Sequence, residues 1–237
     1  MKIKLFVGLV SALAGQILSA AEKIPSPPAT PAKTVESTAA APVKSLRNLG
    51  IHAGRTKTGG TRNQNAGLAA PVVLAPSEVA RTISESPVFY WLCDGGGQVS
   101  FVFTLTLPRA DEPVLEKVVK DQKSGGVYGI DLAALGVKLE VDRDYEWSVS
   151  TIVRDESSSR DIVSQGRIRR VTAGPEVAAV LAGAPAGARH EIYSRSGLFY
   201  DAVAALLPMV EARPDDAKLR ADLDGLLATF KVAVVRR

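Results

Sequence analysis

The stretch DYEWSVSTIVR, residues 144–154, decides the fold. Its charged and serine side chains alternate with larger ones, so that one face collects Tyr145, Trp147, Val149, Thr151 and Val153. Strict alternation with a period of two predicts a β-strand that buries one face and exposes the other. The polar residues 155–159 that follow predict a turn.

The residues just before this strand predict how it is held in place. Leu139 precedes Tyr145 by six residues, across the turn-like residues 142–144. A leucine, a turn and a tyrosine that opens a strand resemble the tyrosine corner of immunoglobulin and fibronectin type III sandwiches, whose tyrosine hydroxyl bonds back to the upstream backbone. The Pro-Gly pair usual in such turns is absent here. The pattern favours an immunoglobulin-like fold with Trp147 in its core.

Further strands are predicted on both sides of this stretch. Residues 87–93, PVFYWLC, are aromatic and apolar and end at a glycine-rich turn, and residues 98–107 alternate with a period of two. Other candidates are 114–120, 127–132 and 162–171. Short strands at this spacing predict an antiparallel β-sandwich over residues 72–172.

The pattern becomes helical after residue 172. Helices are predicted at 175–182, 188–196 and 198–212, and a last one begins at the Pro-Asp-Asp of residues 214–216. The last two have apolar residues at helical spacing and are joined by a proline-containing turn. Residues 173–237 are therefore expected to form a helical hairpin packed on the sandwich, which makes the fold mainly β with α.

Residues 1–21 have the pattern of a secretory signal peptide. Two lysines precede a mostly apolar run at 5–18, and small residues then suit cleavage after Ala21 or Ala20. The alternative is a retained membrane anchor, but the run is shorter than the roughly 20 residues that span a bilayer. No later segment is long and apolar enough to span one, so we expect a periplasmic or secreted location.

Residues 22–71 are rich in Pro, Ala, Ser, Thr, Gly, Asn and Lys and have no aromatic residue, which predicts a disordered tether. The chain of 237 residues has a net charge of +4, and this positive charge belongs to the tether and the N-terminus. From residue 72 onward acidic residues outnumber basic ones, which argues against nucleic-acid binding. The basic tether could lie against anionic envelope polymers or lipids, or could serve only as a solubilising linker.

The sequence shows no recognisable catalytic, metal or cofactor site. The two histidines, His52 and His190, are far apart, and the neighbours His190 and Glu191 would diverge by about 100° on a helix. Neither a Gly-x-Ser-x-Gly elbow nor a phosphate-binding glycine loop is present. The single cysteine, Cys93, is expected to be a small buried residue on a strand. We therefore expect neither an enzyme nor a bound cofactor.

Two arginines provide the one candidate binding site. Arg167 and Arg169 share a face of the strand predicted at 162–171, so they could present two guanidinium groups to an anionic partner. The alternative is a charged strand that discourages edge-to-edge pairing.

Several sequence blocks together resemble a known family. They are TGGTR at 58–62, Thr82, PVFYW at 87–91, DYEW at 144–147, QGRIRRV at 165–171, IY at 192–193 and GLFYDA at 197–202. In this order and spacing, over residues 58–232, the chain resembles the bacterial domain-of-unknown-function family numbered 928. Two departures are a missing third glycine in the first block and the absence of a tryptophan near Leu223. The resemblance implies an exported protein with a β part and a helical end, and no assigned activity.

The expected function is that of a non-catalytic binding or adaptor module of the cell envelope, with a protein or a glycan as its partner. An enzyme whose site is assembled only in three dimensions is one alternative, and a structural spacer or assembly factor is another. The sequence specifies neither the partner nor the oligomeric state.

Overall fold

The computed structural model describes residues 43–46, 49, 51–53, 70–95, 97–123, 125–152, 163–232 and 234–236. The predicted signal peptide and most of the predicted tether lie outside these ranges. Within the described ranges, no helix has the length and apolar character needed to cross a membrane.

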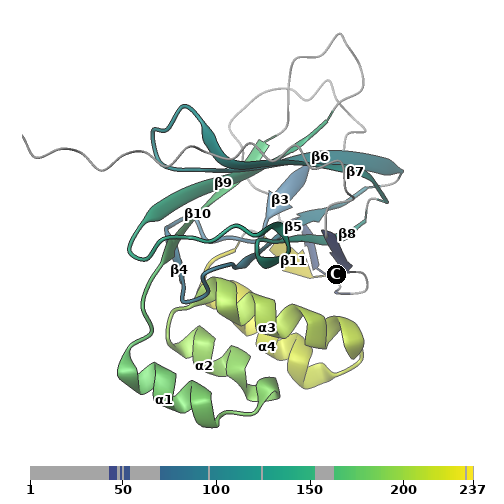
Figure 1. The fold of residues 1–237 in the computed structure, drawn as a ribbon. Helices are drawn as coiled ribbons and strands as arrows, with labels where there is room; N and C mark the ends of the chain where they lie inside the picture. The colour runs from purple at the N-terminus through teal and green to yellow at the C-terminus, as the bar shows by residue number, and fades with distance from the viewer. Residues whose placement is uncertain are drawn as a thin grey trace, which may run out of the picture. The chain divides into compact units, whose positions relative to one another are not determined.

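The smaller of the two main sheets is antiparallel throughout (Figure 1). Its strands, in spatial order, are β1 (Val43–Leu46), β8 (Gly126–Asp131), β5 (Val88–Cys93) and β3 (Pro71–Val73). Because β5 is buried on both faces, it consists of apolar and aromatic residues without alternation.

The larger sheet is mixed, although the sequence predicted antiparallel strands only. Its spatial order is β4 (Ala80–Thr82), β10 (Val163–Arg170), β9 (Asp144–Thr151), β6 (Gln98–Thr106) and β7 (Pro113–Lys123). The β4 strand runs parallel to β10, with Ala80 opposite Ile168. Since the strands β5 to β9 lie between these two in the chain, no hairpin turn fixes their relative direction.

Aromatic side chains of the two sheets meet in a shared core. The ring of Phe89 lies 4.8 Å from that of Trp147 and 5.4 Å from that of Phe103, measured between centroids. The predicted inner face of β9 is buried at Tyr145, Trp147, Val149 and Thr151. The hydroxyl of Tyr145 accepts a hydrogen bond of 3.0 Å from the backbone N–H of Glu140, as the corner motif predicts.

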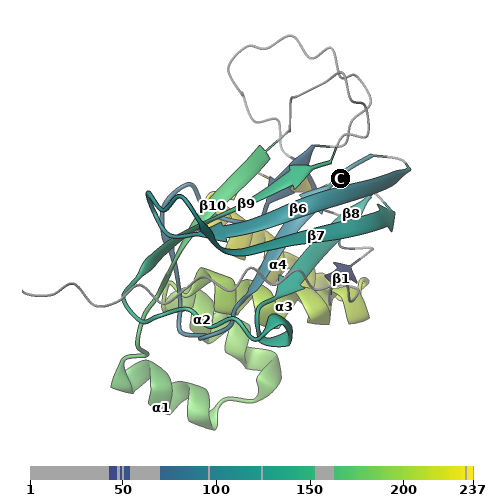
Figure 2. The same ribbon diagram turned by 45° about the horizontal axis from the view of Figure 1, so that its top comes forward.

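Four helices lie together on the side of the smaller sheet that faces away from β6 and β7 (Figures 1 and 2). They are α1 (Pro175–Gly183), α2 (Arg189–Arg195), α3 (Phe199–Ala212) and α4 (Ala217–Thr229). Short 3₁₀ turns occur at η1 (Ala133–Leu135) and η2 (Ala186–Ala188). Asp216 caps α4 by accepting hydrogen bonds from the N–H groups of Lys218 and Leu219.

Two stretches inside the predicted tether are strands. The first, β1, pairs with β8, and the second, β2 (Ile51–Ala53), pairs with β11 (Val234–Arg236). Leu46 and Leu49 are only 6% and 3% exposed. The edge of β8 has backbone groups that an extended segment can pair with, and the two leucines add buried apolar surface. A short segment can therefore join the sheet as a strand without an alternating pattern in its sequence. For these stretches the prediction of disorder is wrong, and apart from Leu49 the remainder of 22–69 lies outside the described residues.

Candidate functional site

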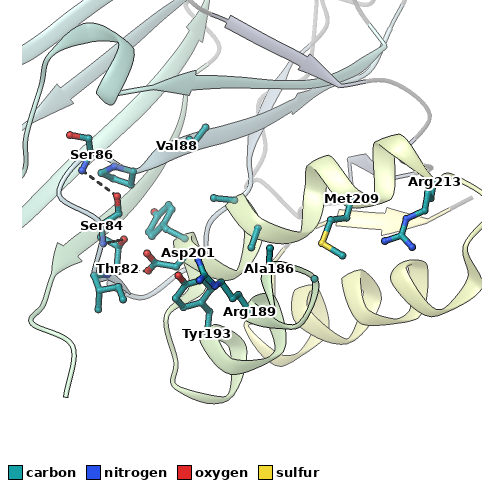
Figure 3. A pocket seen from close by; sticks show the side chains of 16 residues that line it. Thr82, Ser84, Ser86, Val88, Ala186, Arg189, Tyr193, Asp201, Met209 and Arg213 are labelled. Atoms are coloured by element: carbon teal, nitrogen blue, oxygen red, sulfur yellow. Dashed lines mark hydrogen bonds between the residues drawn. The ribbon is translucent and has the colours of Figure 1, made fainter. Parts of the chain in front are cut away.

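A groove of about 840 Å³ separates the segment that joins β4 to β5 from helices α2 and α3 (Figure 3). One wall is polar and contains Thr82, Ser84 and Ser86. The opposite wall is largely apolar and contains Ala186, Ala204, Ala205 and Met209, with the charged side chains Arg189 and Arg213 beside it. A mostly apolar concavity with a few polar groups is the usual form of a ligand or peptide site.

Asp201 lies at the base of the groove and is 9% exposed. Its side chain points from α3 toward Thr82, and its Oδ2 accepts a hydrogen bond of 3.1 Å from the N–H of Ile83. Burial raises the pKa of Asp201, while hydrogen bonds from the backbone of Ile83, the Thr82 side chain and the Ser84 backbone act in the opposite direction. The carboxylate therefore fastens the β4–β5 segment to α3.

The serines of the polar wall are also engaged within the protein. The hydroxyl of Ser86 donates to the carbonyl of Val137 at 2.8 Å, and that of Ser84 accepts from the N–H of Ser86. Among the described residues that line the groove there is neither cysteine nor histidine, and Asp201 is the single acid. Covalent catalysis by a nucleophile and an adjacent base uses residue types of this kind in pairs.

Helix α1 is an apolar helix on the surface. Every residue of α1 is described, and none of the nine is buried, although the sequence PEVAAVLAG is mostly apolar. Val180 is 55% exposed. The η2 turn that follows α1 contributes Ala186 and Gly187 to the groove. The helix and the groove therefore belong to neighbouring parts of the chain.

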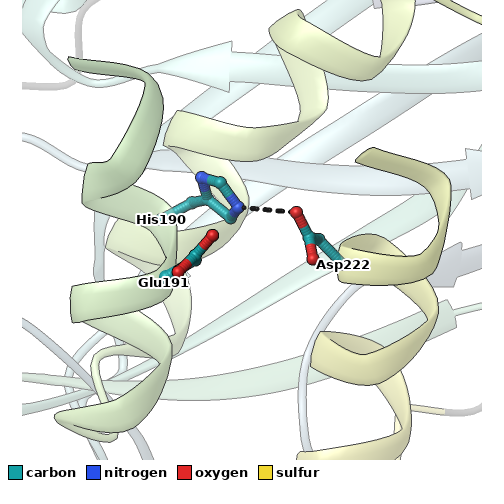
Figure 4. Close-up of side chains that lie close together, drawn as sticks. All are labelled: His190, Glu191 and Asp222. Atoms are coloured by element: carbon teal, nitrogen blue, oxygen red, sulfur yellow. Dashed lines mark hydrogen bonds and ion pairs between the residues drawn. The ribbon is translucent and has the colours of Figure 1, made fainter. Parts of the chain in front are cut away.

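A second cluster joins α2 to α4 (Figure 4). The Nε2 atom of His190 lies 3.2 Å from Oδ2 of Asp222, and the ammonium of Lys218 donates at 2.8 Å to both Glu191 and Asp222. Hydrogen bonding to Lys218 lowers the pKa of Glu191. In Asp222, burial raises the pKa, but hydrogen bonds from Lys218 and His190 outweigh it and leave the pKa lowered. Both carboxyl groups are therefore ionised at neutral pH.

The sequence did not reveal this cluster. Ligand atoms of His190, Glu191 and Asp222 all lie within 4.8 Å of one another, although the helical divergence of His190 and Glu191 argued against a shared ligand. Asp222 and Lys218 come from α4. Asp222 contacts His190, and Lys218 bridges Glu191 and Asp222. The only available signal was the acidic and basic residues one turn apart on the last predicted helix.

The two arginines of the predicted site bind groups within the protein. Arg169 forms a paired hydrogen bond with the Asp144 carboxylate, at 2.7 Å for Nη2, and Arg167 donates to the carbonyl of Ser77 at 3.1 Å. Across the β9–β10 ladder, Arg167 is opposite Glu146 and Arg169 is opposite Asp144. The two arginines share an exposed face, as predicted, and their guanidinium groups contact intramolecular partners.

Two other residues weighed from the sequence lie apart from the groove lining. Cys93 is fully buried at the end of β5, and burial raises the pKa of its thiol to about 12. His52 is in β2, opposite Val235, whereas His190 is in α2.

Four of the sequence blocks meet at one buried junction. Trp147 donates a hydrogen bond to the hydroxyl of Tyr200, and the Phe89 ring lies 5.6 Å from the ring of Tyr200. A Cβ atom on Gly166 would lie 2.8 Å from Nε1 of Trp147 and 2.7 Å from Cβ of Ala75. The four blocks therefore hold the sheets and helices together. This structural role accounts for the aromatic residues and the glycine that they contain.

The fold and the groove define a protein of mixed α and β structure with two facing sheets and four helices on one side. Its sequence matches the family described as Domain of Unknown Function (DUF928) over residues 57–236, and the chain belongs to that family. This confirms the resemblance drawn from the sequence blocks. No curated protein matches the sequence.

Two solved structures resemble the chain weakly. The E. coli chaperone DraB is 15% identical, with a TM-score of 0.29 over 46% of this chain and 57% of that one. Astrotactin-2, described as a conserved vertebrate-specific and perforin-like membrane protein involved in neuronal development, is 10% identical, with a TM-score of 0.29. This second match covers 68% of this chain and 39% of that one, so the chain spans less than two thirds of either protein.

Proposed function

We propose that the protein is an exported, non-catalytic module that binds a partner protein in the cell envelope through α1 and the adjoining groove. The observation that supports this most is the exposure of α1, a mostly apolar helix in which no residue is buried. Apolar surface left in water is costly, and contiguous patches of it commonly mark interaction sites. The groove adds a concave surface with Arg189 beside it for a carboxylate on the partner.

A non-catalytic role is supported by the state of the polar groups in the groove. The Asp201 carboxylate accepts from the β4–β5 segment, and Ser86 donates to a backbone carbonyl. A general base needs a lone pair directed at the substrate, whereas an oxygen of Asp201 accepts from a backbone N–H of the protein, and the Ser86 hydroxyl proton is held by the Val137 carbonyl and not by a base.

Export is the second element of the proposal. It is supported by the two N-terminal lysines, the apolar run at 5–18 and the small residues that end at Ala21. Fractionation of expressing cells, with mass spectrometry of the N-terminus, tests it. A periplasmic or secreted protein that begins at Glu22 or Ala21 is expected, and a cytoplasmic protein that retains residues 1–21 would contradict it.

We also infer an immunoglobulin-like sandwich with the helical hairpin packed on it. The hydrogen bond from Glu140 to the Tyr145 hydroxyl and the aromatic contacts between β5, β6 and β9 support this description. An experimental structure with a strand order incompatible with that fold would contradict it.

The binding proposal is tested with two valines that are both 55% exposed, Val180 on α1 and Val163 on β10. Each is replaced by glutamate in the mature protein, which is then used for crosslinking and capture from envelopes. We expect Val180→Glu to lose a partner that the wild type and Val163→Glu both retain. Equal capture by all three would refute binding through α1, and loss of capture after glycosidase treatment would point to a glycan instead.

A further inference from the structure

We propose that His190, Glu191 and Asp222 form a binding site for a divalent transition metal, with Zn²⁺ as the preferred ion, and that the ammonium of Lys218 yields its place when the metal binds. This inference does not depend on the proposed function, because the cluster lies between α2 and α4 and shares no lining residue with the groove.

The distances between donor atoms fit a metal. Zinc bonds of roughly 2.0–2.2 Å place the ligand atoms of one ion about 3.5 Å apart. Nε2 of His190 and Oδ2 of Asp222 are already 3.2 Å apart, and all three ligand atoms lie within 4.8 Å of one another. The Glu191 side chain is 45% exposed, so a change of rotamer can bring its carboxylate closer.

The donor types select the class of metal. One imidazole with two carboxylates is a nitrogen and oxygen set that suits Zn²⁺ and its neighbours in the first transition row. Magnesium and calcium prefer oxygen ligands alone and higher coordination numbers. Three protein ligands leave further coordination positions for water or a ligand from solution.

The environment of the His190 imidazole is a second, independent observation that supports a metal site. His190 is only 3% exposed, and among the described residues its Nδ1 has no hydrogen-bond partner. Buried polar groups are normally satisfied, so an imidazole whose Nδ1 has no partner and whose Nε2 contacts only the Asp222 carboxylate is unusual for a purely structural residue. A cavity of about 390 Å³ lies beside the ring and is lined by His190, Glu191 and Asp222 themselves. A Cβ on Gly225, in the same cavity, would meet no atom within 4 Å, so the cavity is open at this helix position too.

Lys218 competes with the metal. Its ammonium lies 2.8 Å from an oxygen of Glu191 and 2.8 Å from an oxygen of Asp222, so one positive charge already bridges the two carboxylates. The lysine side chain is 68% exposed and can move into solvent at little cost. Because Nδ1 lacks an acceptor that would fix the metal-binding tautomer, and because Lys218 must leave, wild-type affinity is expected to be modest.

The test is a zinc titration of the untagged mature protein by calorimetry, repeated with Co²⁺ to record its visible d–d absorption. We expect one equivalent of zinc, bound at least about tenfold more tightly by Lys218→Met, since the competing charge is removed. Lys138→Met is the matched control, because Lys138 is 67% exposed and pairs with Glu85 at 2.8 Å, as Lys218 does with its partners. This control should bind zinc as the wild type does.

Ligand variants complete the experiment. In the Lys218→Met background, His190→Gln should abolish the binding of one equivalent of zinc. His52→Gln, which removes the other histidine of the chain, should leave zinc binding unchanged. If His190→Gln fails to fold, Asp222→Asn replaces it, because that side chain is 24% exposed. Absence of stoichiometric binding to Lys218→Met would overturn the proposal, as would binding that depends on His52 or that survives Asp222→Asn.

Discussion

The indole Nε1 of Trp147 donates a hydrogen bond of 2.8 Å to the hydroxyl of Tyr200, which in turn donates to the carbonyl of Arg167 at 3.1 Å. This chain of two bonds ties β9, β10 and α3 together inside the core. Both side chains are nearly inaccessible to water. Any change that breaks the chain therefore leaves a buried polar group without a partner.

Tyr200→Phe removes the hydroxyl and keeps the ring. We expect a loss of about 1–3 kcal/mol in the free energy of unfolding, because the Trp147 N–H and the Arg167 carbonyl both lose their partner. Urea denaturation measures the change. Tyr193→Phe, at a half-buried tyrosine of the groove, is the control and should stay within about 0.5 kcal/mol of the wild type. An equal effect of both substitutions would contradict the role given to the Tyr200 hydroxyl.

Gly166→Ala is expected to destabilise the protein by about 1–3 kcal/mol. The new methyl group would lie 2.7 Å from Cβ of Ala75 and 2.8 Å from the Trp147 indole, which is closer than van der Waals contact. Gly225→Ala in α4 should have the opposite sign, since its Cβ meets open space and alanine favours a helix by about 0.5–1 kcal/mol. Thermal denaturation of both variants measures the two changes in stability. A stabilised Gly166→Ala protein would contradict the close contact of Gly166 with Ala75 and Trp147.

The strands show what alternation in the sequence can predict. The strand over Asp144–Thr151 and the strand over Gln98–Thr106 were predicted because each buries one face along eight or nine residues. By contrast, β2 and β4 have three residues each, too few for a period to be visible. The parallel pairing of Ala80 with Ile168 joins distant parts of the chain, and no local pattern encodes it.

The candidate sites were harder to predict than the strands. His190 and Asp222 are 32 residues apart, and only the packing of α2 and α4 against α3 brings them within 3.2 Å. The groove likewise combines the β4–β5 segment with α3, through Asp201 and Ile83. The sequence did place Arg167 and Arg169 on one face, but their partners come from other elements and were not predicted.

The role of β1 is tested by truncation. Deletion of residues 22–50 removes Leu46 and Leu49, which are buried, and should lower the free energy of unfolding by at least about 2 kcal/mol. Deletion of residues 22–41 leaves both leucines and should change it by less than about 0.5 kcal/mol. Chemical denaturation of the two truncated proteins measures the difference. Equal stability would mean that β1 contributes nothing to the fold.

The ion pair of Asp144 and Arg169 predicts a pH dependence. The hydrogen bond from Arg169 lowers the pKa of the Asp144 carboxyl in the folded protein. The pair therefore stabilises the fold above the ordinary aspartate pKa, and this contribution is lost as the pH falls through the folded-state value.

Arg169→Gln should raise the pKa of Asp144 toward its ordinary value, which NMR titration of the side-chain carboxyl measures. Arg167→Gln should raise it less, because Arg167 acts on Asp144 only through longer-range attraction. A pKa that is unchanged in Arg169→Gln would show that the hydrogen bond does not hold in solution.

Cys93 is expected to be unreactive in the native protein. It is fully buried, and its thiol pKa is raised to about 12, so very little thiolate exists at pH 8. A chromogenic disulfide reagent should label one thiol rapidly in denaturant and only slowly without it. Rapid labelling of the native protein at pH 8 would contradict the burial of β5 at this residue.

The short ribbon of β2 and β11 has a consequence for how the domain can be rearranged. Ala53 pairs with Val234 and Ile51 with Arg236, so the chain enters and leaves this ribbon at neighbouring points. Domains with adjacent ends tolerate circular permutation and insertion into a surface loop of a host protein. The stretch from Val43 to Arg236, which keeps β1 and its two buried leucines, could therefore be joined by a linker and reopened at an exposed turn, or carried as a cassette within another protein.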